Sequence, residues 1–324
     1  MANSNQKRVR QFHSRTDAFE VLKGLNVANK TFAITGTTSG IGVDTAEVLA
    51  LAGAHVVLIN RNLRESENQK SRILEKKRDA KVDFVQCDLS DLRSVRRAGE
   101  EYVAKNWPIH GLILNAGVFR PAVLETKDGF ETHFGVNVVA HFALLRVLLP
   151  VVRRSAPSRI VILSSTLSTR VGFKKSMTLE RKLELLCGQD ASTSALQKYG
   201  ASKLADMHLA FKLHRDEHKN GVSTYAVHPG DAVRTDIFRN SPLGKILSVV
   251  TAPFTKNSSQ GAATTVYCAT HPEVAEVSGR YWESCWDDEK RIDKEAARDE
   301  ELQEALWRKL EAIDDRINGR LGSV

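Results

Sequence analysis

Short runs of consecutive apolar residues recur along the chain and alternate with longer stretches of helical periodicity. Runs that stay apolar at successive positions are typical of strands buried on both faces. The predicted strands are 31–35, 55–59, 82–85, 111–114, 159–163, 223–227 and 279–282. Helical patterns of ten or more residues lie between them, at 42–52, 62–79, 91–106, 128–153, 199–219 and 258–270.

This alternation predicts an α/β fold, a Rossmann-type doubly wound parallel sheet of about seven strands with helices on both faces, in a single domain. We predict an N-terminal extension with a short helix over 1–28, a dinucleotide-binding domain over 29–286 and a charged C-terminal helix within 287–324. The apolar stripe of that last helix predicts either docking on the domain edge or a pairing surface; it consists of Leu302, Leu306, Leu310, Ile313 and Ile317.

Two segments interrupt the alternation, at 166–198 and 231–257. They follow the carboxyl ends of the fifth and sixth predicted strands, where open α/β sheets bind ligands. We therefore expect them to build the substrate pocket. The first has a helical pattern from Met177 to Leu186 and is a candidate basic lid, with Arg170, Lys174, Lys175, Arg181 and Lys182.

The composition fits a globular domain with a sizeable core, because 42% of the 324 residues are hydrophobic and 27% are charged. The net charge is +8, but Lys and Arg are scattered rather than gathered in a stripe. A nucleic-acid partner is therefore not predicted. The cysteines have neither zinc-ligand nor disulfide-framework spacing, which predicts no metal site and a reducing, cytoplasmic location; they are Cys87, Cys187, Cys268 and Cys285.

The first 30 residues are polar and basic and lack the apolar core of a secretory signal. No run of about eighteen apolar residues occurs, so no transmembrane helix is expected, while peripheral contact with a membrane stays open.

A glycine-rich turn, Thr35-Gly36-Thr37-Thr38-Ser39-Gly40-Ile41-Gly42, joins the first strand to the first long helix. Glycines let the backbone approach a pyrophosphate, and the helix start offers free N–H groups. The alternative is a glycine loop that serves packing alone. The predicted cofactor contacts are Gly36, Thr38, Ser39, Gly40, Ile41 and Gly42.

Two further strand ends carry candidate cofactor contacts. Arg61 follows the second strand, where an acidic residue would favour NAD; an arginine there favours the 2′-phosphate of NADP. The alternative is a solvent-facing arginine. Asp88 and Leu89 follow the third strand. Asp88 can accept from an adenine amino group or cap the next helix, and the sequence leaves both open.

The fourth strand ends at Asn115-Ala116-Gly117, whose small residues let the backbone pass a cofactor ribose. We expect the amide of Asn115 to tie neighbouring strands together. Asn137 lies inside an apolar helix, where a buried amide must find hydrogen-bond partners and most often finds them in the backbone.

Tyr199 and Lys203 lie four residues apart in a helical pattern, so their side chains share one face. An ammonium beside a phenol stabilises the phenolate, which suits proton exchange with an alcohol or carbonyl near neutral pH. Ser164-Ser165 ends the fifth strand, where a hydroxyl can hold a substrate oxygen or only shape a turn. Pro229-Gly230 ends the sixth strand and would wall in a nicotinamide.

In this order the motifs resemble the short-chain dehydrogenase/reductase family over about residues 28–285. The retinol-dehydrogenase-like branch is indicated by 15–16, 21–24, 153–157, 228–230, 253–256 and 260–264. Within it, the chain is most similar to the dehydrogenase part of oxidoreductases that also carry WW domains. Residues 1–30 contain no tryptophan, so we expect no such module in this sequence.

The resemblance implies a catalytic set. Tyr199 would be the general acid/base, and Lys203 would assist it and bind the nicotinamide ribose. Ser165, second of its pair, would place the substrate oxygen. Asn137 would hold a water on a proton path.

The resemblance also implies a cofactor and a substrate class. We expect an NADP(H)-preferring enzyme, with NAD(H) as the alternative, that acts on a lipophilic retinoid, steroid or aldehyde. Ser39 stands where some NADP users carry a basic residue, so Arg61 alone supports NADP. Family members often form homodimers through the helices that here are 128–153 and 199–219. The rival hypothesis is a non-catalytic regulatory or scaffold protein that keeps the cofactor site.

Overall fold

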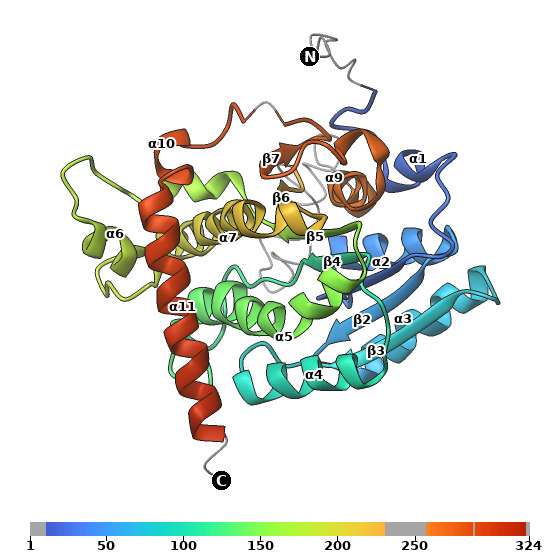
Figure 1. Cartoon of the computed structure of the whole chain (residues 1–324), viewed down its shortest axis with the longest axis horizontal. Helices are drawn as coiled ribbons and strands as arrows, with labels where there is room; N and C mark the ends of the chain where they lie inside the picture. The colour runs from blue at the N-terminus through green and yellow to red at the C-terminus, as the bar shows by residue number, and fades with distance from the viewer. Residues whose placement is uncertain (1–10, 231–256, 288, 322–324) are drawn as a thin grey trace, which may run out of the picture.

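The computed structural model describes residues 11–230, 257–287 and 289–321. Its centre is a seven-stranded sheet in the order β3-β2-β1-β4-β5-β6-β7, with every neighbouring pair parallel (Figure 1). The strands are β1 (Thr31–Thr35), β2 (His55–Asn60), β3 (Lys81–Gln86), β4 (Gly111–Leu114), β5 (Ser158–Leu163), β6 (Val222–His228) and β7 (Arg280–Glu283). The predicted fold class and all seven strand positions are confirmed.

Helices cover both faces of the sheet and close a hydrophobic core on each. One face carries α4 (Leu92–Ala104), α5 (Ala140–Arg154) and α7 (Ala195–Glu217). The other carries α1 (Ala18–Leu22), α2 (Ile41–Leu51), α3 (Leu63–Lys76) and α9 (Ser258–Thr270). All five residues of β1 are buried, because this strand lies between both layers. The continuous apolar runs of the sequence therefore follow from burial on two sides.

The strand order reverses between β1 and β4, which leaves a crevice outside the carboxyl ends of these strands. The glycine turn follows β1, and the predicted catalytic residues come from the segments after β4 and β5 and from α7. Residues 231–256, which make up most of the second predicted insert, lie outside the described residues, as do residues 1–10.

Two predicted helix starts need correction. The helix expected over 128–153 begins at Thr132, because an antiparallel bridge between Glu125 and Glu131 and a turn at Gly129, with φ of 79°, occupy the preceding residues. Close to its start, η1 (Phe134–Val139) is a π-helix that continues into α5. The helix expected over 199–219 starts four residues earlier, at Ala195, because Ser194 and Gln197 form a capping box.

The charged tail is shorter as a helix than predicted. It forms α10 (Lys294–Ala297) and α11 (Glu300–Leu321), separated by a break. The predicted docking on the domain edge is confirmed and the pairing surface is wrong, because all five residues of the apolar stripe are buried within the chain. α11, red in Figure 1, packs on α7 and on α6 (Leu179–Leu186).

α11 also reaches α5, where Trp307 stacks edge-on against Phe142 with ring centroids 5.0 Å apart. Arg146 of α5 pairs with Asp314 of α11 at 3.0 Å. The helices that the family resemblance offers for a homodimer are α5 and α7. The chain's own tail therefore occupies part of the face on which that dimer was expected.

Among the described residues, one segment meets the length and composition of a membrane span, Phe134–Arg154, where none was expected. Of its most apolar window, 78% is buried inside the protein. Core helices of globular proteins pass the same test, so this segment is weak evidence for a span.

Candidate active site

α7 brings Tyr199 and Lys203 to the carboxyl edge of the sheet. Lys203 is buried, with its Nζ atom 5.9 Å from the centroid of the Tyr199 ring. The ring is held edge-on by Phe119, with centroids 4.8 Å apart, and by His133 at 6.0 Å. His133 is fixed in turn by Glu131, whose Oε1 lies 2.7 Å from its Nδ1. Packing from two sides thus orients the tyrosine beside the lysine.

Lys203 is tied into the protein by two hydrogen bonds. Its ammonium donates to the carbonyl of Leu163, the last residue of β5, at 2.8 Å and to Oδ2 of Asp206 at 2.9 Å. Burial lowers the pKa of Lys203, but the charges of Asp206 and Tyr199 outweigh it and hold the pKa above its usual value. Burial raises the pKa of Asp206 to about 6, against the opposing effect of Lys203. At pH 7 the Lys203 ammonium keeps its proton and the Asp206 carboxyl has lost its own, so the two form an ion pair.

The two serines after β5 have different hydrogen bonds. The Ser164 hydroxyl donates to the carbonyl of Lys203 at 2.6 Å, which joins the end of β5 to α7. Ser165 Oγ accepts from the N–H of Leu167 at 3.2 Å and caps η2 (Thr166–Arg170). The Ser165 hydroxyl proton is not used in these bonds. The geometry is therefore compatible with the predicted choice of Ser165 for the substrate oxygen.

Asn137 lies in the π-helical turn and is fully buried. Its Oδ1 accepts from the N–H of Val118 at 2.8 Å, and its Nδ2 donates to Ser202 Oγ at 2.9 Å. The carbonyl of Asn137 lies 3.0 Å from Nδ1 of His141. The expectation that a buried asparagine bonds to its surroundings is confirmed, and the water-holding role stays a prediction. A π-turn at this point is typical of functional sites.

The glycine turn is shaped by close contacts. A Cβ placed on Gly42 would lie 2.1 Å from the Gly36 carbonyl oxygen, and one on Gly36 would lie 2.7 Å from the Cα of Ala116. Gly36 also has φ of 70°, a region that favours glycine. Packing alone accounts for these two glycines.

The start of α2 points beyond packing. Its N-cap is Gly40, which has no side chain to accept a cap hydrogen bond, and no other side chain of the described residues accepts from the first N–H groups of the helix. By contrast, the N-cap side chains of α3, α4, α7 and α9 do accept such bonds; they are Asn62, Asp91, Ser194 and Asn257. A helix start whose N-cap is a glycine leaves its first N–H groups accessible to a pyrophosphate. The start of α2 therefore fits a dinucleotide cofactor.

A hydrogen-bond hub beneath the turn was not predicted from the sequence. The hydroxyl of Thr35 accepts from the N–H groups of Asn115 and Ala116, each at 3.0 Å, and lies 3.0 Å from Nε2 of His141. Burial, together with the charge of Lys203, lowers the pKa of His141 to about 3, so its ring is neutral. The carbonyl of Asn137 accepts from the Nδ1–H group of His141, so Nε2 of the neutral ring carries no proton. The Thr35 hydroxyl therefore donates to Nε2.

Asn115 has the role that was expected of it. Its Nδ2 donates to the carbonyls of Thr35 and Gly36 at 2.9 and 2.8 Å, which ties the end of β4 to the end of β1. Gly117, two residues on, lies next to the catalytic candidates. A Cβ placed on Gly117 would be 3.5 Å from Lys203 Nζ and 3.4 Å from Asn137 Oδ1. The segment 115–117 therefore links the cofactor turn to the Tyr–Lys helix.

Arg61 is exposed directly after β2. The residue before it, Asn60, is buried, and its Oδ1 accepts from the N–H of Thr37 in the glycine turn at 2.8 Å. Its Nδ2 donates to the hydroxyls of Thr37 and Ser66. Asn60, which the sequence did not single out for a role, thus fixes the turn against β2. Arg61 is left at the surface beside it, a position that suits either a 2′-phosphate contact or a solvent-facing side chain.

Asp88 does not cap the following helix, so that alternative is wrong. The N-cap is Asp91, three residues later, whose side chain accepts from Arg93 and Ser94. Oδ1 of Asp88 accepts from the Ser90 hydroxyl at 2.7 Å, and Oδ2 pairs with Lys127 at 3.1 Å. Burial raises the pKa of Asp88, but the hydrogen bonds from Ser90 and Lys127 outweigh it and hold the pKa below its usual value. The adenine contact stays a prediction, as does that of Leu89, which packs against the core.

The insert 166–198 packs onto the start of the Tyr–Lys helix. A Cβ on Gly200 would lie 2.5 Å from the carbonyl of Leu167, so η2 and α7 are in close contact. Three of the basic residues proposed for a lid have acidic partners instead, among them Lys175, which lies 3.8 Å from Glu295. Arg181 pairs with Glu184 at 3.0 Å, and Lys182 pairs with Asp299 ahead of α11 at 2.8 Å. The Arg181 pair lies within α6, and the Lys182 pair ties α6 to the segment before α11.

Pro229 and Gly230 follow β6, as predicted, and Gly230 has φ of 104°. They are the last described residues before 231–256. Their proposed place beside the nicotinamide stays a prediction.

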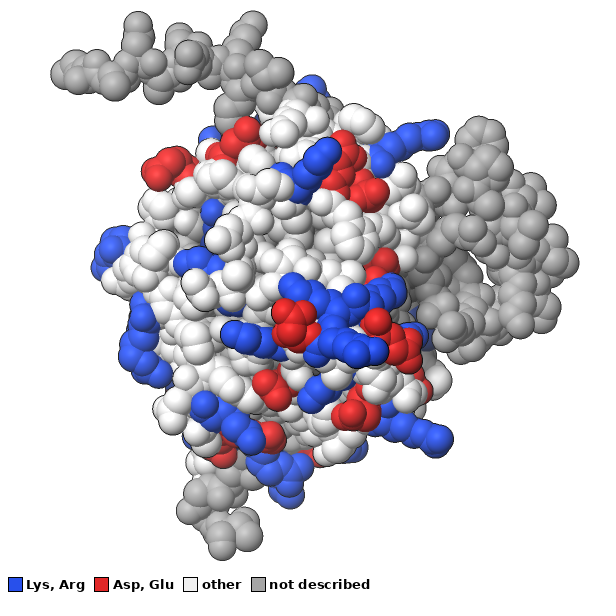
Figure 2. All heavy atoms as spheres, turned by 90° about the vertical axis from the view of Figure 1, so that its right-hand side faces the viewer, with Lys and Arg blue, Asp and Glu red and all other residues white. Residues whose placement is uncertain are grey.

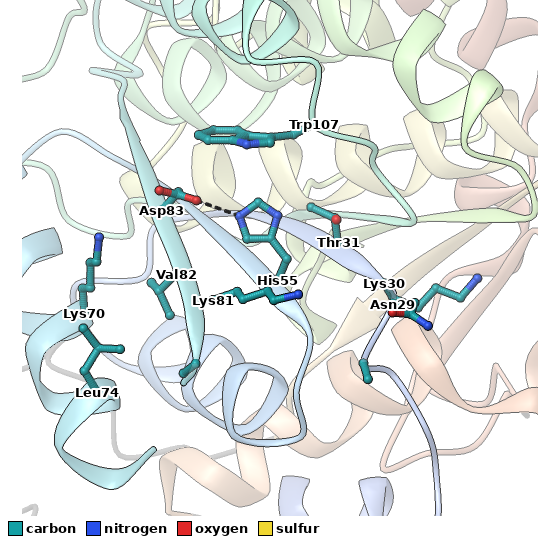
Figure 3. Close-up of a pocket in the computed structure, with 12 residues that line it drawn as sticks. Asn29, Lys30, Thr31, His55, Lys70, Leu74, Lys81, Val82, Asp83 and Trp107 are labelled. Atoms are coloured by element: carbon teal, nitrogen blue, oxygen red, sulfur yellow. Dashed lines mark hydrogen bonds and ion pairs between the residues drawn. The ribbon is translucent and has the colours of Figure 1, made fainter. Parts of the chain in front are cut away.

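A hollow of about 650 Å³ lies at the opposite edge of the sheet (Figure 3). It is lined by the first residues of β1, β2 and β3, and its wall includes His55 paired with Asp83 at 2.9 Å and Trp107 stacked edge-on to His55. Parallel α/β sheets bind ligands at the carboxyl ends of their strands, and this hollow lies at the amino ends. The candidate active site is therefore the region around Tyr199 and not this hollow.

On the face seen in Figure 2, basic side chains lie among acidic ones, with a group of both signs near the middle. The arrangement in this view is a mixed surface and not a continuous basic stripe.

Comparisons with known proteins agree with the motifs. A family model described as short chain dehydrogenase matches residues 30–177. The WW domain-containing oxidoreductase of Pongo abelii is 39% identical over 316 residues, 97% of this chain and 74% of that protein. Retinol dehydrogenase 12 of Mus musculus is 38% identical over 284 residues, 87% of this chain and 85% of that protein.

A solved structure of an uncharacterized protein from Mycobacterium paratuberculosis has a TM-score of 0.67 at 26% identity and covers 90% of this chain and 96% of its own. The resemblance to the retinol-dehydrogenase-like branch, and within it to oxidoreductases with WW domains, is confirmed. With its sheet topology, its Tyr–Lys helix and these relatives, the chain belongs to the short-chain dehydrogenase/reductase family, whose members are nicotinamide-dependent oxidoreductases.

Proposed function

We propose that the chain is an NADP(H)-preferring oxidoreductase that transfers a hydride between nicotinamide and the carbonyl or alcohol carbon of a lipophilic small molecule. The observation that carries this proposal is that Tyr199 and Lys203 share one face of α7. There Lys203 donates to Leu163, two residues before Ser165, and Asn137 donates to Ser202. A retinoid is the first substrate to test, because the mouse relative is named a retinol dehydrogenase. Steroids and aldehydes are the next classes.

Each side chain has a task that its geometry supports. The Tyr199 hydroxyl gives a proton to the substrate oxygen during reduction and takes it back during oxidation. Lys203, as a buried ammonium, stabilises the phenolate form of Tyr199. The Ser165 hydroxyl donates to the substrate oxygen and orients it. A nicotinamide, when bound, supplies or accepts the hydride.

The cofactor side of the proposal depends on the start of α2 and on the end of β2. The uncapped N–H groups after Gly40 would hold the pyrophosphate. β2 ends at Asn60 and is followed by Arg61, and neither residue is a carboxylate that could accept from a ribose 2′-hydroxyl. Arg61 is exposed and would pair with the 2′-phosphate of NADP.

Turnover is tested by mixing the purified chain with NADPH or NADH and a panel of retinal, steroid ketones and aliphatic aldehydes. Tyr199→Phe is the matched variant, because it removes one oxygen and keeps the ring packed by Phe119 and His133. We expect this variant to bind NADPH as the parent does and to lose about 100-fold or more in turnover. Undiminished turnover would refute the assignment of Tyr199. No reaction across the panel would favour the scaffold hypothesis.

Arg61→Asp tests the cofactor preference. It replaces the proposed 2′-phosphate partner by a repelling charge, so the Kd for NADPH should rise by roughly 10- to 100-fold while the Kd for NADH changes little. Arg72→Asp, an exposed site farther along α3, makes the same charge change and is the control. Equal losses of NADPH and NADH binding in Arg61→Asp would remove the reason for preferring NADP.

A further inference from the structure

The ion pair between Lys203 and Asp206 is the most deeply buried of the ion pairs in the described residues. The exposed fractions of the two side chains are 5% and 1%. The ammonium has three N–H bonds, of which one goes to Asp206 Oδ2 and one to the carbonyl of Leu163. A third remains for a ligand or for the Tyr199 oxygen. The direction of that third bond is set by the other two.

The carboxylate of Asp206 lowers the stability of the folded protein. Its second oxygen, Oδ1, is buried and has no hydrogen-bond partner among the described residues. Leaving a buried acceptor unsatisfied costs about 1–3 kcal/mol, and an apolar replacement of a buried ion pair is often neutral or stabilising. Leu209 and Ala210, three and four residues along α7, are buried apolar residues on the same face, so that face would accept an apolar side chain. Stability alone therefore does not account for the carboxylate.

The carboxylate changes the charge that Tyr199 experiences. An ammonium alone would favour the phenolate strongly, whereas an ammonium paired with a carboxylate presents little net charge and yet stays protonated to high pH. The raised pKa of Asp206, about 6, means that the carboxylate is ionised at neutral pH and becomes neutral in mild acid.

Other titratable groups around the pair come from every side of α7. His141 of α5 is neutral, and His133 is fixed by Glu131. The helices α6, α10 and α11 also pack on α7, and Glu304 of α11 pairs there with Lys212 and Arg215. Tyr199 on α7 and His141 on α5 interact electrostatically with Lys203. His133, held by Glu131, lies against the Tyr199 ring, and Arg170 of η2 lies near Gly200.

We infer that Asp206 is a positioning residue for the proposed reaction: it holds the Lys203 ammonium against the end of β5 and sets the pH range in which Tyr199 works. This inference depends on the roles proposed above for Tyr199 and Lys203. Asp206 touches neither substrate nor cofactor in this scheme and acts through the lysine.

The first test is the pH profile of retinol oxidation with NADP⁺, in which the acid limb reports Tyr199 and the alkaline limb reports Lys203. Asp206→Asn keeps the size of the side chain and one acceptor but removes the charge. Both limbs should move to lower pH by about one unit or more, because the phenolate is favoured and the ammonium is no longer held. Unmoved limbs overturn the inference.

Asp216→Asn is the matched control. It removes the same charge from the same helix, at a carboxylate that pairs with Lys212 at 2.8 Å and is 36% exposed. Its profile should coincide with that of the parent. If Asp216→Asn moves the limbs as far as Asp206→Asn does, the effect is that of overall charge and the inference fails.

The second test needs no turnover. The titration of Lys203 is followed in the cofactor-free protein by the NMR signal of its Cε group, assigned by the loss of that signal in Lys203→Arg. Asp206→Asn should lower the midpoint of Lys203 by more than about one pH unit. An unchanged midpoint overturns the inference. If no substrate is turned over, the proposed function fails, and this midpoint alone decides whether Asp206 holds the ammonium.

Should Asp206→Asn fail to fold, Asp206→Glu takes its place. It keeps the charge on a longer stem, so the limbs should stay where they are while kcat falls because the ammonium is displaced. Limbs that move, or an unchanged kcat, contradict the positioning role.

Discussion

The two halves of α7 carry the same kinds of residue and use them differently. In the first half, Lys203 pairs with Asp206, and both side chains are at most 5% exposed. In the second half, Lys212 pairs with Asp216 and with Glu304 of α11, whose side chains are 36% and 42% exposed. The buried pair lies beside the catalytic tyrosine candidate, and the outer pair fastens the tail helix.

Burial accounts for this difference. A surface ion pair is screened by water and contributes little to stability, so it is replaceable. A buried pair must keep both partners, because removing one leaves an uncompensated charge in a medium of low polarity. One continuous helix thus combines a rigid, sensitive end at the site with a tolerant end at the surface.

The largest effect is expected for Lys203→Met, which leaves Asp206 buried and alone. The free energy of unfolding at pH 7 should fall by about 3–5 kcal/mol, and turnover should be lost. The double variant Lys203→Met/Asp206→Leu should regain most of the stability but none of the turnover. Urea unfolding and the retinal assay check both parts. A single variant as stable as the parent would contradict the comparison.

The next effect concerns pH. The pKa of Asp206 is raised from 3.8 to about 6 in the folded protein, so the folded state binds a proton that the unfolded state has released. This stabilising contribution is complete below pH 4 and is lost as the pH rises through about 6. Relative to Asp206→Asn, the parent should lose on the order of 2–3 kcal/mol between pH 4 and pH 7. Unfolding free energies measured from pH 4 to pH 7 check this. Curves that run parallel for the parent and Asp206→Asn would contradict the prediction.

The smallest effect is expected at the outer pair. Lys212→Met should lower the free energy of unfolding by about 1 kcal/mol or less, because its partners are solvated and Met keeps some contact with Trp307. The difference from the parent should shrink further in high salt. Chemical denaturation at two salt concentrations measures this. A loss as large as that of Lys203→Met would remove the distinction between the two halves.

Local patterns account for what could be predicted. The seven strands follow from apolar runs, because each strand needs burial on both faces. The glycine turn was found because its glycines stand where a strand leads into a helix. Tyr199 and Lys203 were found because a spacing of four residues on a helix implies a shared face.

What depends on distant contacts could not be predicted. Thr35 and His141 are 106 residues apart and meet only in the folded protein. Asp206 reads as one more charged residue on a helix until its burial is known. Asp88 and Asp91 offer the same capping chemistry three residues apart, so the sequence alone does not choose between them. The backbone of the folded chain makes Asp91 the cap. The start of the helix before Asn137 was placed too early because the bridge between Glu125 and Glu131 forms only in the folded chain.

The π-turn of η1 makes this segment sensitive to the deletion of a single residue. A π-turn is equivalent to one residue inserted into an α-helix, and each residue of an α-helix turns the chain by about 100°. Deleting any one residue of Phe134–Val139 would restore an ordinary helix but rotate its two ends against each other. Asn137 and His141 would then no longer meet Val118 and Thr35 together. Sequence changes that keep this spacing are therefore tolerated far better than a single deletion.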